Sequence, residues 1–339
     1  MQTLTLGNHG LSVSALGLGC MGMSEFYGTP DEPEAIATIQ RALELGVSLI
    51  DTADMYGRGA NEELVGKALS AVRDQAIVAT KVGIVRRDDG SYAGSCGRPD
   101  YIYKACDASL TRLGIETIDL YQLHRVDPSV PIEETVGAMA ELIAAGKVRF
   151  IGLSEALPSD IRRAAAIAPI STLQNEYSLF ERGIEDAALE TCAELGIGVL
   201  AYAPLGRGML TGRYDSSTKF EPGDWRLGGP RWQTGNLESN LKLVAALEAF
   251  ADQRGATAGQ VALAWLLHQR DWIVPIPGTR RRRYLDENAA SATLALNTDE
   301  LAELARIVPR SAIAGERYPP ERTPNYSTPP LAGADADRS

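Results

Sequence analysis

The sequence predicts a single (β/α)8 barrel of the TIM-barrel type, an α/β fold in which helices enclose eight parallel strands. Three observations lead to this fold class. Eight short apolar segments have the character of buried strands, and amphipathic segments with helical periodicity alternate with them. Such alternation is typical of parallel βαβ units, and eight strands close this barrel. The length of 339 residues is one that α/β barrels use for a single domain.

The predicted strands and helices follow one another in a regular order. Strands are predicted at residues 14–19, 47–51, 76–81, 118–124, 148–154, 170–176, 198–204 and 272–278. Helices are predicted at residues 34–46, 61–72, 99–114, 132–146, 158–168, 185–196 and 241–255, and a further helix is expected to begin at Arg280. Several helical segments end on glycine, which is common at helix C-termini.

An open, doubly wound sheet is the alternative fold. It requires a glycine-rich turn of the GxGxxG type after the first strand, and residues 17–22, GLGCMG, match that string. A lone match is weak evidence. No helical pattern opens at it, and the acidic residue expected about twenty positions later at the end of a second strand is absent. The barrel is therefore the preferred prediction.

Three segments lie outside the strand–helix repeat. Residues 3–14 predict a β-hairpin with its turn at 7–10, which we expect to cover the barrel floor. Residues 205–235 form a long Gly-rich loop at the C-terminal face, and a loop of that length is usually functional. We expect residues 1–316 to form the barrel domain and the Pro-rich residues 317–339 to form a partly disordered tail.

Composition and charge bear on the classes of partner. A net charge of −11 argues against nucleic acid or an anionic membrane as the main partner. The four cysteines form no CxxC pair, so neither a disulfide framework nor a zinc site is expected. No signal-peptide pattern opens the sequence, and no apolar run approaches the ~20 residues that a membrane span needs. We expect a cytoplasmic protein, and its oligomeric state is open.

Four chemically reactive side chains are expected at the C-terminal rim of the barrel, where barrel enzymes hold their active sites. The second strand ends on Asp51 and is followed by Tyr56, the third ends on Lys81, and the fourth ends on His124. Each residue alone has an ordinary structural explanation, such as a turn, packing, a solvent-facing charge or a hydrogen-bonded core group. The barrel brings all four to neighbouring positions, which favours a functional site.

These residue types suit the reduction of a carbonyl group. A free tyrosine has a pKa of about 10 and is a poor proton donor at neutral pH. A neighbouring ammonium stabilises the phenolate, so we expect Lys81 to lower the pKa of Tyr56 and to make it a general acid. Asp51 is expected to hold Lys81, and His124 to orient the carbonyl. No side chain supplies a hydride, so a nicotinamide cofactor is required.

The chain resembles the aldo-keto reductases over roughly residues 1–315, and in detail the bacterial and fungal branch of pyridoxal-reductase-like and ketone-reducing enzymes. The matching segments are GLGCMGMS, LIDTADMYG, NEELVGKAL, ATK, DLYQLHRVDP, GKVRFIGLSE, LQNEYSLF, AYAPLGRGMLTG and PIPGTRRRRYLDEN. The resemblance implies NADPH-dependent reduction of aldehydes and ketones to alcohols by hydride transfer from the nicotinamide. It also implies a catalytic tetrad of Asp51, Tyr56, Lys81 and His124, with Tyr56 as the proton donor.

The resemblance further implies a binding site for NADPH/NADP+. Ser154 and Gln174 match the residues that hold the nicotinamide carboxamide, and Tyr202 matches the aromatic that stacks on the nicotinamide ring. Other implied contacts lie along the pyrophosphate (Pro204, Leu205, Gly206, Gly208), around the adenosine 2′-phosphate (Gly278, Thr279, Arg280, Tyr284) and at the adenine (Glu287, Asn288). The expected set is completed by Gly19, Cys20, Met21, Asp51, Glu155 and Arg213.

Two features of this cofactor site are particular to the sequence. Glu155 stands where many family members have asparagine; its carboxylate can accept a hydrogen bond from the carboxamide but cannot donate one. Residues 280–283 are four consecutive arginines. They form either a solvated helix start or a clamp for the 2′-phosphate at a helix N-terminus, which Arg213 is placed to join.

The expected substrate is a small-molecule carbonyl compound in a groove formed by the rim loops. The expected substrate contacts are Met21, Tyr56, His124, Trp225 and Trp232, and no metal is expected. Two other functions are compatible with the sequence: a redox-sensing or regulatory subunit with slow or no turnover, and a metal-dependent barrel hydrolase or isomerase. The metal enzyme needs His, Asp and Glu clusters at several strand ends, and one rim histidine is too few.

Overall fold

Eight parallel strands form one sheet that closes into a barrel, as predicted. The computed structural model describes residues 1–319. In their order around the barrel, the strands are β3 (Leu18–Gly19), β4 (Leu49–Asp51), β5 (Ile77–Val82), β8 (Ile118–Leu123), β9 (Val148–Ser154), β10 (Ile170–Glu176), β11 (Gly198–Tyr202) and β12 (Ile273–Pro275). The amides of Gly17 and Gly19 donate hydrogen bonds to the carbonyls of Pro275 and Pro277. These bonds join the first strand to the last and close the ring.

The strands are buried on both faces, which explains their nearly continuous apolar character. All six residues of β8 and all seven of β10 are buried. Side chains alternate between the two faces: Leu120 and Leu200 belong to a cluster inside the barrel, whereas Tyr121 and Val199 belong to the layer between strands and helices. Because both layers consist of packed, buried side chains, the strands and their carboxyl ends have fixed positions.

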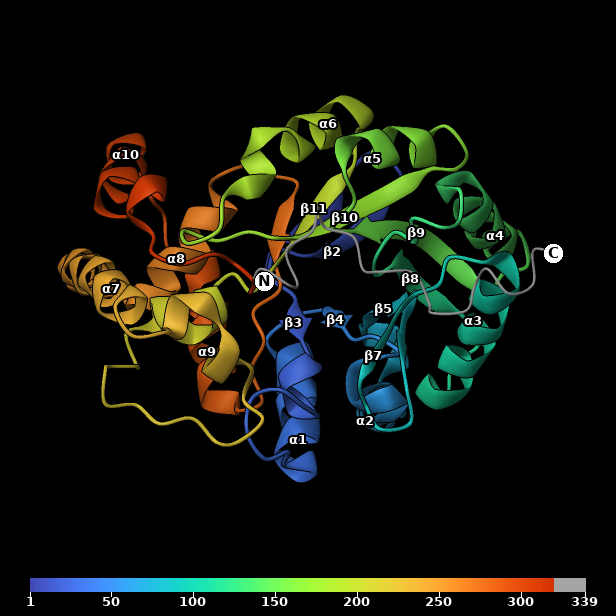
Figure 1. Ribbon diagram of the computed structural model, residues 1–339, viewed down its shortest axis with the longest axis horizontal. Helices are drawn as coiled ribbons and strands as arrows, with labels where there is room; N and C mark the ends of the chain where they lie inside the picture. The colour runs from blue at the N-terminus through green and yellow to red at the C-terminus, as the bar shows by residue number, and fades with distance from the viewer. Residues whose placement is uncertain (320–339) are drawn as a thin grey trace.

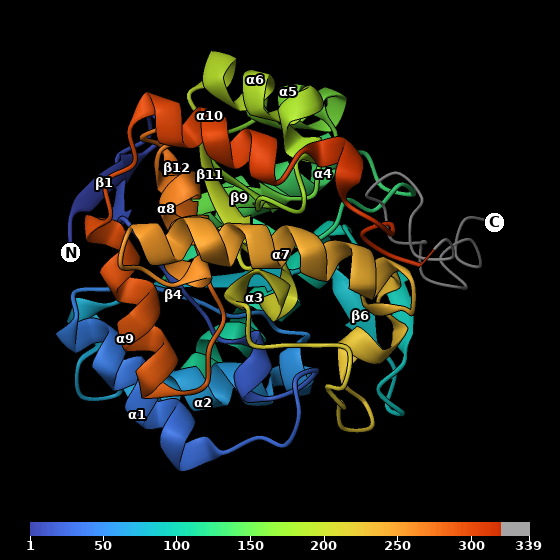
Figure 2. The same ribbon diagram turned by 90° about the vertical axis from the view of Figure 1, so that its left-hand side faces the viewer.

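The helices surround the sheet (Figure 1). Those that alternate with the strands are α1 (Glu32–Glu44), α2 (Ala60–Leu69), α3 (Pro99–Leu113), α4 (Ile132–Ala144), α5 (Pro158–Ala165), α6 (Ala188–Leu195), α8 (Ala258–Leu267) and α9 (Arg282–Ala290). Two further helices, α7 (Asn236–Gln253) and α10 (Thr298–Ile307), lie side by side on the outside of this layer (Figure 2).

Helices α8 and α10 were not predicted. Eight of the ten residues of α8 are buried, so its sequence AGQVALAWLL shows no polar face and no amphipathic period. Helix α10 does carry a sequence signal: Asn297 and Glu300 form a capping box at its start. That signal is recognisable in the residues alone.

Two hairpins flank the barrel at its opposite ends. The predicted N-terminal hairpin consists of β1 (Thr3–Leu6) and β2 (Leu11–Ser14), and it packs Leu6, Leu11 and Val13 against the inner cluster of the barrel. A second hairpin, β6 (Ile84–Arg86) with β7 (Tyr92–Ser95), follows β5. Figure 2 shows β1 and β6 at opposite sides of the molecule.

The predicted long loop, residues 205–235, contains three short 3₁₀ helices at Gly206–Thr211, Trp225–Gly228 and Pro230–Trp232. The predicted C-terminal tail begins at residue 317, and its first three residues are described and lie against the mouth of the barrel. The prediction for residues 320–339 lies outside the described residues.

Candidate active site

The C-terminal ends of three neighbouring strands bring four predicted site residues together. Asp51 is the last residue of β4, Lys81 lies near the end of β5, and His124 directly follows β8. Tyr56 begins the 3₁₀ turn that follows β4. All four residues are buried, and Lys81 has no exposed surface. The barrel thus places these residues at one point of its rim.

A buried asparagine holds the loops beside Tyr56. Asn61, at the start of α2, donates hydrogen bonds from Nδ2 to the Cys20 carbonyl at 2.9 Å and to Ser24 Oγ at 2.7 Å. Its Oδ1 accepts a hydrogen bond from the Thr52 hydroxyl at 2.6 Å. One side chain therefore ties the loop after β3 to the loop after β4, and this fixes the turn on which Tyr56 lies.

The Lys81 ammonium is the centre of a hydrogen-bonded group. Its Nζ donates to Asp51 Oδ1 at 2.6 Å, to the Thr52 carbonyl at 2.7 Å and to Tyr56 Oη at 3.4 Å. These three acceptors equal the number of N–H groups on an ammonium. The other oxygen of Asp51 accepts from Gln174 Nε2 at 2.7 Å. Lys81 is thereby fixed with one N–H directed at the tyrosine oxygen.

Burial dominates the protonation equilibria of Tyr56 and Lys81. It raises the pKa of Tyr56 well above 10.0, and the charge of Asp51 raises it further. Burial also lowers the pKa of Lys81 from 10.5, although Asp51 opposes this shift. The expectation that Lys81 lowers the pKa of Tyr56 is therefore not met in this structure. Because Asp51 offsets the ammonium charge at 2.6 Å, desolvation of the phenolate prevails.

His124 is a neutral imidazole beside the tyrosine ring. The two rings meet edge to face with their centroids 5.7 Å apart. Burial lowers the pKa of His124 well below 6.5, and the charges of Arg125 and Lys81 add to this effect. The His124 Nδ1 atom is buried without a hydrogen-bond partner among the described residues, and the ring lines a large cavity. A neutral imidazole here can hydrogen-bond a ligand oxygen without carrying charge.

This cavity has a volume of about 960 Å³ and opens at the C-terminal face of the barrel. It is large enough for a dinucleotide-sized ligand. The predicted site residues on its wall are Gly19, Met21, Asp51, Tyr56, His124, Ser154, Gln174, Tyr202, Pro204, Leu205, Gly208, Arg213, Trp225, Gly278, Thr279, Arg280, Tyr284 and Asn288. Most of the predicted set therefore borders one space.

A model of the Aldo/keto reductase family matches residues 15–309, which include all eight barrel strands and the four rim residues. The chain belongs to the aldo/keto reductase family. Two relatives agree with this assignment. The protein named "Probable aldo-keto reductase 1" from Glycine max is 45% identical over 329 residues, which cover 94% of this chain and 92% of that protein. "Aldo-keto reductase yakc [NADP(+)]" from Schizosaccharomyces pombe is 42% identical over 325 residues, covering 94% and 95% of the two chains.

A solved structure gives the same assignment in three dimensions. The glycerol dehydrogenase of Gluconobacter oxydans matches this chain with a TM-score of 0.84 at 33% identity, covering 91% of this chain and 95% of that one. The aldo/keto reductase resemblance inferred from the motifs is thus confirmed, and so is the barrel fold.

Six predicted residues of this aldo/keto reductase do not lie on the cavity wall: Cys20, Lys81, Glu155, Gly206, Glu287 and Trp232. Lys81 lies behind Asp51 and Tyr56. Trp232 is buried and packs edge to face against Tyr214 and Phe220. Its ring belongs to the core beneath the long loop, so the structure does not place it at the substrate groove.

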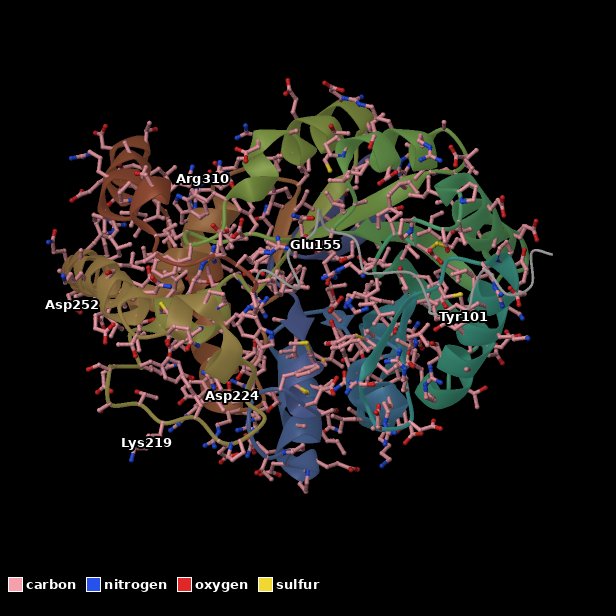
Figure 3. All side chains as sticks on the ribbon, viewed as in Figure 1. Tyr101, Glu155, Lys219, Asp224, Asp252 and Arg310 are labelled. Carbon is pink, nitrogen blue, oxygen red and sulfur yellow. The ribbon has the colours of Figure 1, made fainter. Side chains whose placement is uncertain are left out.

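Glu155 is occupied by protein groups. Its Oε1 accepts from the Glu176 amide at 3.0 Å, and its Oε2 accepts from Arg317 Nη2 at 2.6 Å. Burial raises the pKa of this carboxyl, but the charges of Arg317 and Arg125 together with the hydrogen bonds from Arg317 and the Glu176 amide outweigh burial, so the pKa is lowered overall. Figure 3 shows Glu155 near the middle of the barrel. Both oxygens therefore have a partner within the protein and Glu155 does not line the cavity, so its hydrogen bond with the carboxamide stays a prediction.

The four consecutive arginines separate into two groups. Arg280, Arg281 and Arg283 line the cavity. Arg282 turns away and forms an ion pair with Glu34 of α1 at 2.9 Å. Helix α9 begins at Arg282, so one of the four side chains points along the outer helix layer while its neighbours face the cavity. The arginine run is therefore partly surface and partly cavity wall.

Arg213 also reaches this part of the cavity. Its guanidinium lies over the Tyr284 ring, 4.0 Å from the centroid, and pairs with Glu287. Glu287 in turn accepts from the Thr257 hydroxyl at 3.0 Å. The long loop is thus attached to α9 beside the arginine group.

The cavity residues that sequence reasoning missed include Arg125, Arg207, Arg317 and Tyr318. Arg207 pairs with Glu176 at 2.9 Å and lies 4.0 Å from the Trp225 ring centroid. The hydroxyls of Tyr318 and Tyr202 are 3.0 Å apart. Arg125 directly follows His124 at a strand end, and that position was a usable signal. Nothing local marks the other three, because their contacts are distant in sequence.

Three further observations concern the described part of the chain. Within residues 1–319, no three His, Cys, Asp or Glu side chains are grouped in a way that could hold a metal ion. No helix in that range combines the length and apolar character needed to cross a membrane. The four cysteines are buried free thiols.

Proposed function

We propose that this aldo/keto reductase is an NADPH-dependent carbonyl reductase that converts aldehydes and ketones to alcohols with Tyr56 as the proton donor. One observation carries the proposal. At the cavity wall, Tyr56 Oη receives a hydrogen bond from the Lys81 ammonium at 3.4 Å, and that ammonium is held by Asp51 at 2.6 Å. A neutral His124 lies against the same ring. Tyr56 is thus a candidate proton donor, with the Lys81 ammonium hydrogen-bonded to its oxygen and the neutral imidazole of His124 beside its ring.

The cavity residues fit the cofactor in charge and in shape. Arg280, Arg281 and Arg283 form no ion pair with a carboxylate in the part of the chain that the structure describes. Positive charge of this kind suits the phosphate that distinguishes NADPH from NADH. The aromatic ring of Tyr202 borders the same cavity beside Ser154 and offers a surface for the nicotinamide. The NADP(+) named for the Schizosaccharomyces pombe relative supports this choice.

The side-chain amide of Gln174 has one polar atom, Oε1, that is free to bind the carboxamide of the nicotinamide. Its Nε2 is used by Asp51 at 2.7 Å, which leaves Oε1 as an acceptor. Ser154 lies on the neighbouring strand, paired with Gln174 in the register of β9 and β10. We propose that these two residues orient the nicotinamide carboxamide, and that the segments 204–208 and 278–288 contact the remainder of the cofactor.

The reaction follows from the roles of the side chains. The bound nicotinamide supplies the hydride. The substrate carbonyl oxygen accepts hydrogen bonds from Tyr56 Oη and from the neutral imidazole of His124, and Tyr56 passes its proton to that oxygen as negative charge develops. The phenolate then formed is stabilised by the Lys81 ammonium. Before the reaction, the raised pKa of Tyr56 keeps its hydroxyl protonated at neutral pH, so the proton is available for transfer to the carbonyl oxygen.

The test is NADPH oxidation by the purified full-length chain, followed by absorbance of the reduced nicotinamide, over a panel of aldehydes, ketones, pyridoxal and keto-sugars. The proposal expects turnover with at least one class and formation of the matching alcohol. Tight NADPH binding without turnover on any member would replace it with a regulatory role. Absence of both binding and turnover would contradict the whole assignment.

A further inference from the structure

The guanidinium group of Arg125 stands out among the charged groups of the cavity. Arg125 directly follows His124, is partly buried and lines the cavity. Its Nη1 donates to the His124 carbonyl at 2.6 Å and to Ser154 Oγ at 3.2 Å. Within residues 1–319 it forms no ion pair, and both of its side-chain hydrogen bonds are donated by Nη1. The three N–H donors on Nε and Nη2 are thus not used among the described residues, and Arg125 lines the cavity.

Three other enclosed arginines beside the barrel mouth are paired, whereas Arg280 at the far part of the cavity, like Arg125, forms no ion pair among the described residues. Arg207 pairs with Glu176 at 2.9 Å, Arg226 with Asp224 at 2.7 Å, and Arg317 with Glu155 at 2.6 Å. The carboxylate of Glu155 acts on Arg125 without forming an ion pair with it, because Glu155 is paired with Arg317. An enclosed charge without a direct counter-charge is costly, so folded proteins rarely leave one without a partner. A ligand with a negative charge would provide Arg125 with the ion-pair partner that the paired arginines already have.

Arg125 also lies close to the reacting centre. Its charge opposes the rise in the pKa of Tyr56 that burial and Asp51 cause. It shares Ser154 with the proposed carboxamide site, and its own backbone continues that of His124. A group bound by Arg125 would therefore lie next to the carbonyl that Tyr56 and His124 hold in the proposed reaction.

We propose that Arg125 binds a carboxylate on the substrate, so that this enzyme prefers carbonyl compounds that carry a carboxylate near the reacting carbon, such as 2-oxo acids and carboxy-aldehydes. The free Nε–H and Nη2–H groups form a fork that can donate two parallel hydrogen bonds to one carboxylate. The inference rests on the proposed function, because it names the substrate class of that site.

The test compares each acid with its own methyl ester, which removes the charge and keeps the carbonyl. Two pairs differ in the spacing of carbonyl and carboxylate: phenylglyoxylate with methyl phenylglyoxylate, and 4-carboxybenzaldehyde with methyl 4-formylbenzoate. A bidentate charge-assisted contact predicts that kcat/KM for the acid exceeds that for the ester roughly ten- to hundred-fold in at least one pair. The Arg125→Met variant should bring this ratio close to unity, and Arg125→Lys should retain only part of it.

The matched control is Arg282→Met, which removes an arginine that faces Glu34 instead of the cavity and should keep the wild-type ratio. The Kd for NADPH, measured on Arg125→Met, separates substrate binding from a role in holding Ser154. If that Kd rises and both substrates lose activity equally, Arg125 positions the cofactor site and the inference is wrong. Ester reduction without any preference for the acid in the wild type also overturns the inference while leaving the proposed function intact. Failure to reduce any of these four compounds by an enzyme that reduces other carbonyls also overturns the inference. Failure to reduce every carbonyl of the wider panel as well overturns the proposed function itself.

Discussion

The carboxylate of Glu155 and the guanidinium of Arg317 form a buried ion pair at 2.6 Å across 162 positions of the sequence. Glu155 lies just beyond β9, with a φ of 54°, in the left-handed region that non-glycine residues seldom adopt. Its other oxygen is held by the Glu176 amide. The pair thus secures a strained strand end and attaches the end of the described chain to the barrel mouth.

Loss of Arg317 should therefore destabilise the protein. We expect Arg317→Met to lower the free energy of unfolding by about 3–5 kcal/mol, because it leaves Glu155 charged and enclosed without its counter-charge. Urea denaturation of both proteins measures the difference. The double variant Arg317→Met with Glu155→Gln should recover a large part of the loss, since neither charge remains. Equal stability of Arg317→Met and the wild type would show that the pair does not hold this segment.

The arginines at the cavity should determine the choice between NADPH and NADH. Arg280→Ala is expected to weaken NADPH binding roughly ten- to hundred-fold, as expected for loss of a charge-assisted contact, and to leave NADH binding nearly unchanged. Arg282→Ala is the matched control, since this side chain pairs with Glu34 outside the cavity. Quenching of tryptophan fluorescence measures both dissociation constants. Equal affinity of the wild type for the two cofactors would show that the four consecutive arginines form a solvated helix start and do not bind the 2′-phosphate.

The pH dependence of the reaction should lack a step at the ordinary histidine pKa. His124 has its pKa lowered well below 6.5, mainly by burial, so it is neutral in the folded protein at pH 6.5 and takes up a proton only at more acidic pH. We expect kcat/KM for a neutral aldehyde to be constant around pH 6.5 and to decline only at pH values well below 6.5. A decline centred near 6.5 that disappears in His124→Asn would show that the imidazole titrates normally.

The sequence predicted the features that depend on local pattern. Strand ends could be located from short apolar segments, so Asp51, Lys81 and His124 could be assigned to one rim before the structure was known. Helix α8 was not predicted because an enclosed helix has no polar face, so its apolar residues do not recur with the helical period. Trp232 was expected in the substrate groove because it is a large aromatic on a rim loop. It instead packs under Tyr214 and Phe220, a contact that depends on how the loop folds.

The electrostatics of the site were less accessible to sequence reasoning. The presence of Lys81 beside Tyr56 suggested a lowered tyrosine pKa, but the balance also depends on burial and on Asp51, which only the structure gives. The same holds for Glu155. Its partner Arg317 lies in a Pro-rich segment expected to form a partly disordered tail, and no local pattern connects the two residues.

The most direct test of the account is the rate of NADPH oxidation by Tyr56→Phe with a neutral aldehyde that the wild type reduces, measured together with the Kd for NADPH. Phenylalanine keeps the ring against His124 and removes the hydroxyl that Lys81 contacts at 3.4 Å. Loss of the general acid predicts a fall in kcat of roughly 10²–10⁴-fold with an unchanged Kd for NADPH. Turnover by Tyr56→Phe near the wild-type rate would contradict the assignment of Tyr56 as the proton donor.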